Sequence, residues 1–78
     1  MDDKEQRESL WGPEAQFSDH KRDEVIRFRE DGIEKQGKIL HVCAPGTTVR
    51  GTPHGILYVV EVRQKGFPSM IAPGDVIV

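Results

Sequence analysis

Short apolar runs separated by turn residues make up most of the chain, and the first of them sets the pattern. Residues 23–30 alternate between apolar and charged positions, with Ile26 and Phe28 on one side of the run and Arg27 and Arg29 on the other. Successive side chains of a strand point to opposite faces of its sheet. The run therefore predicts a strand with one buried face and one face in water.

Four further strands follow from the same kind of pattern. The Asp31-Gly32 dipeptide favours the positive φ values of a tight hairpin turn, and Pro73-Gly74 predicts a second turn. Gly37, inside the next run, predicts a bulge or a sharp bend. The predicted strands are residues 33–42, 56–62, 68–72 and 75–78.

No part of the chain shows the period of an amphipathic helix, so the pattern predicts an all-β protein. We expect one five-stranded antiparallel sheet that curls into a closed barrel, because closure removes exposed strand edges. Its interior would be filled by Ile, Val, Leu and Phe side chains, which leaves no room for a catalytic cavity within one copy.

Residues 1–22 have a different composition from the rest. Leu10, Trp11 and Phe17 are scattered among charged residues, and such a segment buries too little apolar surface to offset the entropy of ordering it. We expect residues 1–22 to form a disordered charged tail and residues 23–78 to form the domain. The alternative is a short docking element whose aromatic side chains order against a partner or against the domain.

Length, cysteine content and charge indicate a small soluble domain and disfavour secreted, membrane and nucleic-acid-binding classes of protein. The chain has 78 residues, 36% hydrophobic and 31% charged, as is typical of one small soluble domain. A single cysteine forms no internal disulfide and favours a reducing, cytoplasmic location. We expect no secretory signal and no membrane span, since no apolar run is long enough. Residues 23–78 carry seven acidic and seven basic side chains, so the basic excess usual in nucleic-acid-binding domains is absent.

The order of these segments resembles that of the SH3-like small barrels, including the KOW and Tudor types. It runs through "EVIRFRE", "GKILHV", a long loop, "YVVEV", a short hairpin, "MIAP" and a closing "DVIV". The resemblance covers residues 23–78 and implies a five-stranded SH3-like barrel. Barrels of this kind bind peptides, RNA or ribosomes, or form parts of enzymes, so the resemblance does not select one function.

The chain also resembles the plasmid-borne type II dihydrofolate reductases, in which a disordered tail precedes a barrel that forms a tetramer around a central pore. The pore of that family is lined by a Val-Gln-Ile-Tyr run before a proline, where this chain has Ser69-Met70-Ile71-Ala72 before Pro73. The resemblance therefore implies the scaffold and self-association, but not the reductase activity. An enzyme site at a symmetric pore lined by Met70 and Ile71 is kept as an alternative.

His41, Cys43 and His54 are candidates for a metal site, because His and Cys are common zinc ligands and alternate residues of a strand share a face. The paired ligand spacing of structural zinc sites is missing, however. We predict no metal and no cofactor, with Cys43 as a small buried hydrophobe and His41 as an ordinary strand residue. The alternative is a Cys43 nucleophile with His41 or His54 as its base, and no catalytic residue is assigned.

The loop at residues 44–55 is a candidate recognition element, since long connections in small domains often carry function. The side chains that suit a phosphate or a carboxylate are Thr47, Thr48, Arg50 and Thr52. The alternative is a permissive hairpin connection built on its glycines and prolines. Phe28 and Tyr58 are expected in the core. Phe67, on a turn, is the aromatic side chain that we expect to be exposed, and the alternative is that it folds back as a plug of the barrel.

A basic face is the candidate nucleic-acid site. It would consist of Arg27, Arg29, Lys35, Lys38 and Arg50. Glu24, Glu30 and Glu34 lie among these residues, so cross-strand ion pairs on a solvated face are the competing interpretation. Aromatic side chains that stack on bases are also scarce.

These observations lead to one main hypothesis about function. It is a small non-enzymatic interaction module that docks on a protein partner, or on copies of itself, through the 44–55 loop, neighbouring turns, Phe67 and Trp11. The alternative is a KOW-type barrel that binds RNA or DNA. No contact with a membrane is expected.

Overall fold

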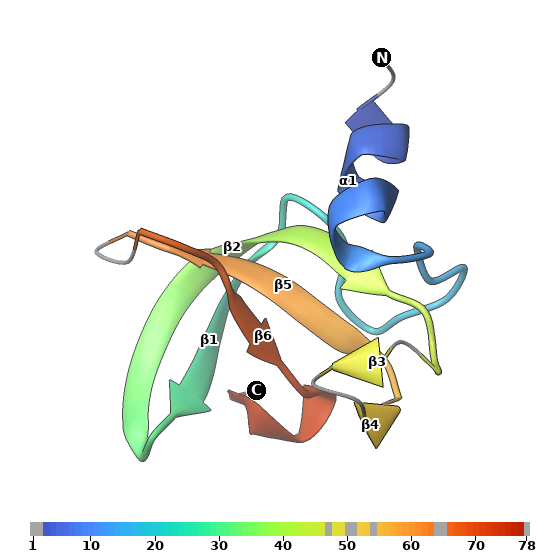
Figure 1. Ribbon diagram of the computed structural model, residues 1–78. Helices are drawn as coiled ribbons and strands as arrows, with labels where there is room; N and C mark the ends of the chain where they lie inside the picture. Colours follow the sequence, from blue (N-terminus) through green and yellow to red (C-terminus); the bar gives the residue numbers. More distant parts are fainter. Residues whose placement is uncertain (1–2, 47, 50–51, 54, 64–65, 78) are drawn as a thin grey trace.

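Most of the chain is strand, with one short helix near the amino terminus (Figure 1). The computed structural model describes residues 3–46, 48–49, 52–53, 55–63 and 66–77, with side chains outside 48–49 and 52–53. Its elements are α1 (Asp3–Trp11), β1 (Val25–Glu30), β2 (Ile33–Cys43), β3 (Thr48–Val49), β4 (Thr52–Pro53), β5 (Leu57–Val62), β6 (Ser69–Ile71), the single-turn helix η1 (Pro73–Asp75) and β7 (Val76–Ile77).

Five strands form one antiparallel sheet in the order β6-β5-β2-β1-β7. These are the five strands that the sequence predicts, and no bound differs from the prediction by more than two residues. The turn between β1 and β2 has positive φ at both of its central residues, 56° at Asp31 and 76° at Gly32. This is the geometry for which the Asp-Gly dipeptide is suited.

Strand β2 lies in the middle of the sheet and pairs with β1 through its first half and with β5 through its second half. Gly37 is required where the two halves meet, because a Cβ atom there would lie 2.4 Å from the carbonyl oxygen of Glu61 and 2.6 Å from Cγ1 of Val60. The predicted irregularity is therefore displaced along the strand. The register shift falls between Ile39 and His41, not at Gly37.

The predicted closed barrel is not confirmed. In the described residues, β6 and β7 lie at opposite ends of the sheet and do not pair with each other. Both are short, three and two residues long, so they offer few ladder positions for closure. The sheet is nevertheless strongly curved, as the bend of β2 shows (Figure 1).

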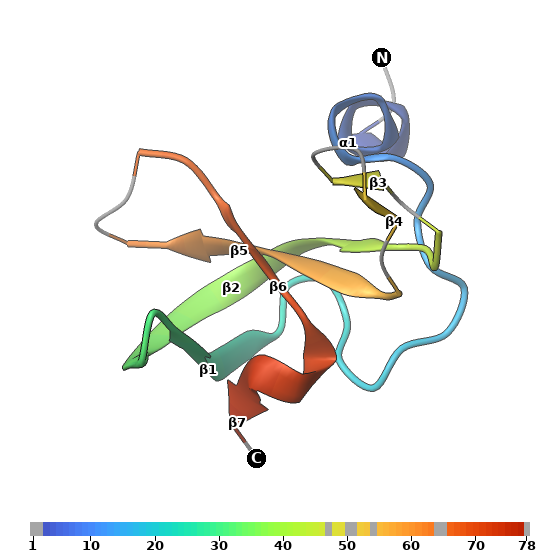
Figure 2. The same ribbon diagram turned by 60° about the horizontal axis from the view of Figure 1, so that its bottom comes forward.

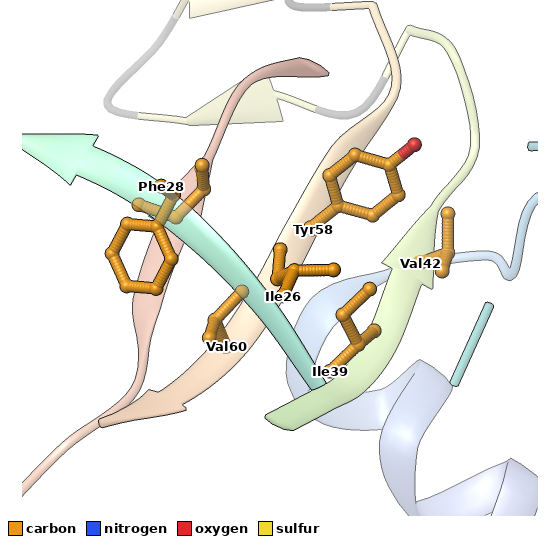
Figure 3. Packing of buried hydrophobic residues seen from close by; sticks show 7 residues of the cluster. Ile26, Phe28, Ile39, Val42, Tyr58 and Val60 are labelled. Carbon is orange, nitrogen blue, oxygen red and sulfur yellow. The ribbon is translucent and has the colours of Figure 1, made fainter. Parts of the chain in front are cut away.

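The core lies on the concave face of this sheet (Figure 3). Its buried side chains are Ile26, Phe28, Ile39, Val42, Tyr58, Val60 and Ile71. Phe28 and Tyr58 are 0% and 1% exposed, which confirms their predicted place in the core. The alternation of β1 is also confirmed, because Ile26 is buried while Arg27 and Arg29 are exposed.

Residues 3–22 differ from the predicted disordered tail. They contain α1 and then a strap that pairs with the edge of β2, through an isolated antiparallel bridge between Glu14 and Cys43. The first turn of α1 carries Asp3 and Glu5, whose charges complement the positive end of the helix dipole. Figure 2 shows α1 end-on beside the sheet. No helix in the described part of the chain has the length and apolar character to cross a membrane.

Candidate functional site on strand β2

A bulge in β2 decides which side chains face away from the core. Ile39 is opposite Val60, but His41, two residues on, is opposite Val59. The extra residue changes the alternation of the strand. His41 therefore lies on the outer face, opposite the core, and Cys43 follows it there, as expected from their spacing.

His41 is 0% exposed, and both of its ring nitrogens have partners. Nδ1 lies 3.4 Å from Nη1 of Arg7, and Nε2 lies 3.0 Å from the carbonyl oxygen of Gly12. A guanidinium only donates hydrogen bonds, so Nδ1 must be the acceptor. The hydrogen-bond pattern thus assigns the neutral ring with its proton on Nε2, which donates to Gly12.

Arg7 is the one buried side chain of α1. Its Nε atom lies 3.1 Å from Oδ2 of Asp3, and its Nη1 atom lies 3.1 Å from Oε1 of Glu14. Two carboxylates therefore balance the guanidinium charge while it contacts His41. Sequence reasoning missed Arg7, although the spacing of Asp3 and Arg7 is that of a helical ion pair.

Cys43 is 0% exposed and belongs to a second apolar cluster with Leu57 and Val59. Trp11 and Leu40 pack against this cluster. Burial raises the pKa of the Cys43 thiol above its ordinary value of 9.0, and its Sγ atom lies 3.4 Å from the carbonyl oxygen of Trp11. A protonated, covered thiol acts here as a packing group and weak donor, since the thiolate is the nucleophilic form.

The predicted metal candidates divide between the described and undescribed parts of the chain. His54 lies outside the described residues. His41 and Cys43 share a face, but their polar atoms contact main-chain carbonyls and Arg7. Within the described ranges, no group of three His, Cys, Asp or Glu side chains is placed to hold a metal ion.

The 44–55 loop contains regular structure, in contrast to the expected unstructured connection. Its strands β3 and β4 pair antiparallel as a separate two-stranded sheet. Thr47 and Arg50 lie outside the described residues, and only the backbone of Thr48 and Thr52 is described. The proposed ligand-binding role of these four side chains stays a prediction.

The two aromatic candidates have opposite environments. Phe67, on the β5–β6 turn, is 69% exposed, as predicted. Trp11 instead packs against the sheet of its own chain, with its ring centroid 5.8 Å from that of His41 and the two planes at 34°. The interpretation of Trp11 as an element that orders against the domain therefore agrees with the structure.

The predicted basic face is divided between the two sides of the sheet. Arg27, Arg29 and Lys38 share the outer face, but Lys35 is opposite Phe28 and so lies on the other face. Nζ of Lys35 is 2.8 Å from Oε1 of Glu30. Nη1 of Arg27 is 3.7 Å from Oε2 of Glu34. These contacts agree with the interpretation of cross-strand ion pairs.

Comparison of the chain with protein-family models, with curated proteins and with solved structures finds no match. The resemblance to SH3-like barrels rests on the segment pattern of the sequence, and the function must be argued from the side chains themselves.

Proposed function

We propose that the protein is a non-enzymatic module that binds a protein partner at the β6 surface, defined as Phe67 and Met70. Phe67 is 69% exposed and Met70 is 40% exposed. Both lie at one end of the sheet, on its terminal strand β6 and on the turn before it. Aromatic and Met side chains are enriched at protein interfaces. The exposure of Phe67 and Met70 is therefore the main observation in favour of the proposal.

The environment of His41 and Cys43 supports a binding role over catalysis. Nucleophilic catalysis needs a thiolate and a base with access to substrate. Both side chains are 0% exposed, and burial holds the thiol in its protonated form. The 44–55 loop, with Thr47, Thr48, Arg50 and Thr52, is part of the proposal as a second contact region.

The alternatives are less well supported. A nucleic-acid site needs cations that are free to meet phosphates, whereas Lys35 and Arg27 are paired with Glu30 and Glu34. A pore site lined by Met70 and Ile71 loses one of its two residues within a single copy, because Ile71 is 3% exposed and packs in the core.

Two finer expectations also belong to this proposal. The first is an SH3-like barrel, which the curvature of β2 and its shared pairing with β1 and β5 support. The second is a cytoplasmic location, for which the single buried thiol of Cys43 is the argument.

The test is a selection of random peptides displayed on phage against the full chain, with a Phe67→Ser, Met70→Ser double variant in parallel. We expect enriched peptides that bind the wild type, shift the amide resonances of residues 66–71, and bind the double variant at least about tenfold more weakly, as for loss of a central anchor. Ile33→Ser is the matched control, since Ile33 is 60% exposed and lies at the start of β2, not on β6 or the turn before it.

The result that contradicts the proposal is either no enriched peptide or equal binding by the wild type and the double variant. Sedimentation analysis of the wild type tests whether the β6 surface binds a second copy of the chain. A dimer that the double variant dissociates assigns the β6 surface to a second copy of the chain, and so still supports a protein-binding role.

A further inference from the structure

Two buried side chains of β2 donate to successive main-chain carbonyls of the amino-terminal segment. The Cys43 thiol lies 3.4 Å from the carbonyl oxygen of Trp11. Nε2 of His41 lies 3.0 Å from the carbonyl oxygen of Gly12. Both acceptors are main-chain carbonyls, so these two hydrogen bonds do not require a particular side chain in the amino-terminal segment.

The next contacts are between main chains. The Ala44 N–H donates to the carbonyl of Pro13 over 2.9 Å, and the Ala15 N–H donates to the carbonyl of Val42 over 2.8 Å. This is an antiparallel strand addition on the edge of β2, beyond the end of its pairing with β1. Strand addition is a recurring way in which proteins bind extended peptides.

The second apolar cluster provides the surface beneath this segment. Cys43, Leu57 and Val59 are buried, with Leu40 beside them, and Trp11 packs against the group. The Trp11 ring also contacts the His41 ring in a tilted arrangement. An aromatic side chain on an apolar surface, followed by a stretch of paired main chain, is the arrangement of a bound peptide ligand.

The requirements on the segment are few. Gly12 has a φ of 90°, which favours glycine. Pro13 has no N–H and needs no acceptor at its nitrogen. The sequence that these features select is an aromatic residue, then Gly-Pro, then two residues in extended conformation.

The segment is also weakly held by the helix that precedes it. Of the side chains of α1, only Arg7 is buried, and Leu10 is 63% exposed. A helix of nine residues is marginal on its own in water. Few buried apolar contacts favour local opening without unfolding of the sheet.

We propose that the carboxyl-terminal half of β2, with His41 and Cys43, is a peptide-binding site that the chain's own residues 11–15 occupy. The ligand that displaces them is an extended segment of a protein partner in which an aromatic residue precedes Gly-Pro. This site is separate from the β6 surface and does not depend on it. The amino-terminal segment then competes with this ligand from within the same chain. Its effective concentration at the site is set by the short linker that joins it to the sheet.

The probe is a dye-labelled synthetic peptide of residues 3–16, measured by fluorescence anisotropy against the full chain. The wild type is compared with an Arg7→Ala, Gly12→Ala double variant, in which the tethered segment loses its buried charge contact and its positive-φ glycine. We expect the peptide to bind the double variant at least about tenfold more tightly than the wild type, because the competitor in cis is weakened. The same peptide with Gly12→Ala is the matched control and should bind at least about tenfold more weakly, because its Ala is strained at positive φ.

Equal binding to both chains, or no binding to a double variant that keeps its sheet spectrum, would overturn the proposal. A second measurement uses the wild type alone and therefore tests the proposal even where the double variant does not fold. In the wild type, the Ala15 and Ala44 amides should exchange with deuterium at least about tenfold faster than the Val60 amide, which lies on β5 between β2 and β6. The reason is that local opening releases the first two amides before the sheet unfolds. Equal exchange rates for these amides would show that the segment leaves only when the sheet unfolds, and the proposal would then be wrong.

Discussion

Among single residues, the position of His41 depends on a detail of the backbone that the sequence pattern does not display. Strict alternation after Ile39 would place His41 in the core, where an imidazole would need a polar partner. The bulge places it on the outer face, where Arg7 and Gly12 supply partners. In the described residues, every buried side-chain nitrogen and oxygen has a hydrogen-bond partner, so this polar contact adds no unsatisfied group to the interior.

Tyr58 gives a pH-dependent prediction at this scale. Burial raises the pKa of its phenol above the ordinary value of 10.0, since the side chain is 1% exposed in the core. The fold thus favours the neutral phenol, so its contribution to stability is complete below pH 10 and is lost as pH rises further. We expect the wild type to lose more stability than Tyr58→Phe between neutral pH and the alkaline range.

The measurement is urea unfolding of both chains at neutral pH and at a pH above the ordinary tyrosine value. The Phe variant keeps the ring and lacks the ionisable group, which makes it the matched control. Parallel loss of stability in the two chains would show that the phenol does not carry the effect.

At the scale of elements, the sequence predicts the strands, whose apolar and polar residues alternate, and does not predict helix α1, which has no such periodic pattern. The strands of the sheet follow from period-two runs such as the one around Phe28, and the first turn follows from Asp31-Gly32. Helix α1 carries no apolar stripe, because it docks through the charged Arg7 and through Trp11 at its end. The period of apolar residues therefore does not predict this helix.

Arg7→Ala tests this docking of α1. The substitution leaves Nδ1 of His41 without its donor and removes the ion pairs of Arg7 with Asp3 and Glu14. Asp3 keeps its second partner, Arg22. We therefore expect a loss of about 1–3 kcal/mol in unfolding free energy. Alanine is the better helix former, so a loss cannot come from helix propensity. Urea denaturation followed by circular dichroism measures both the stability and the helix content.

Gln6→Ala is the matched control, because Gln6 is the preceding helical residue and is exposed. Its stability should stay within about 0.5 kcal/mol of the wild type, as for most surface substitutions. Equal stability of the Arg7 and Gln6 variants would mean that the Arg7 contact contributes nothing to the fold.

On the scale of the whole molecule, the curved sheet is covered differently on its two faces. The concave face holds the core around Phe28 and Tyr58, and the outer face holds the smaller cluster around Cys43, under Trp11. The pattern of the strands predicts the first face well. The second depends on contacts between residues far apart in sequence, such as Arg7 with His41, which local pattern does not encode.

Phe28→Ala measures how much of the stability lies in the core. A buried Phe replaced by Ala costs about 3–5 kcal/mol through lost transfer energy and cavity formation, which is a large share of the total for a small domain. Ile33→Ala is the comparison, since Ile33 is 60% exposed, and should change stability by less than about 0.5 kcal/mol. Similar losses in the two variants, measured by urea unfolding, would contradict the assignment of Phe28 to the core.

The amino-terminal segment is a folded part of the molecule, bound to β2 at His41. The most direct measurement is the set of nuclear Overhauser effects between the Trp11 indole and the His41 ring in the isotope-labelled full chain. We expect clear cross-peaks between the two rings, whose centroids lie 5.8 Å apart. Random-coil shifts for Trp11, with no cross-peak to His41, would contradict this binding of the segment to β2.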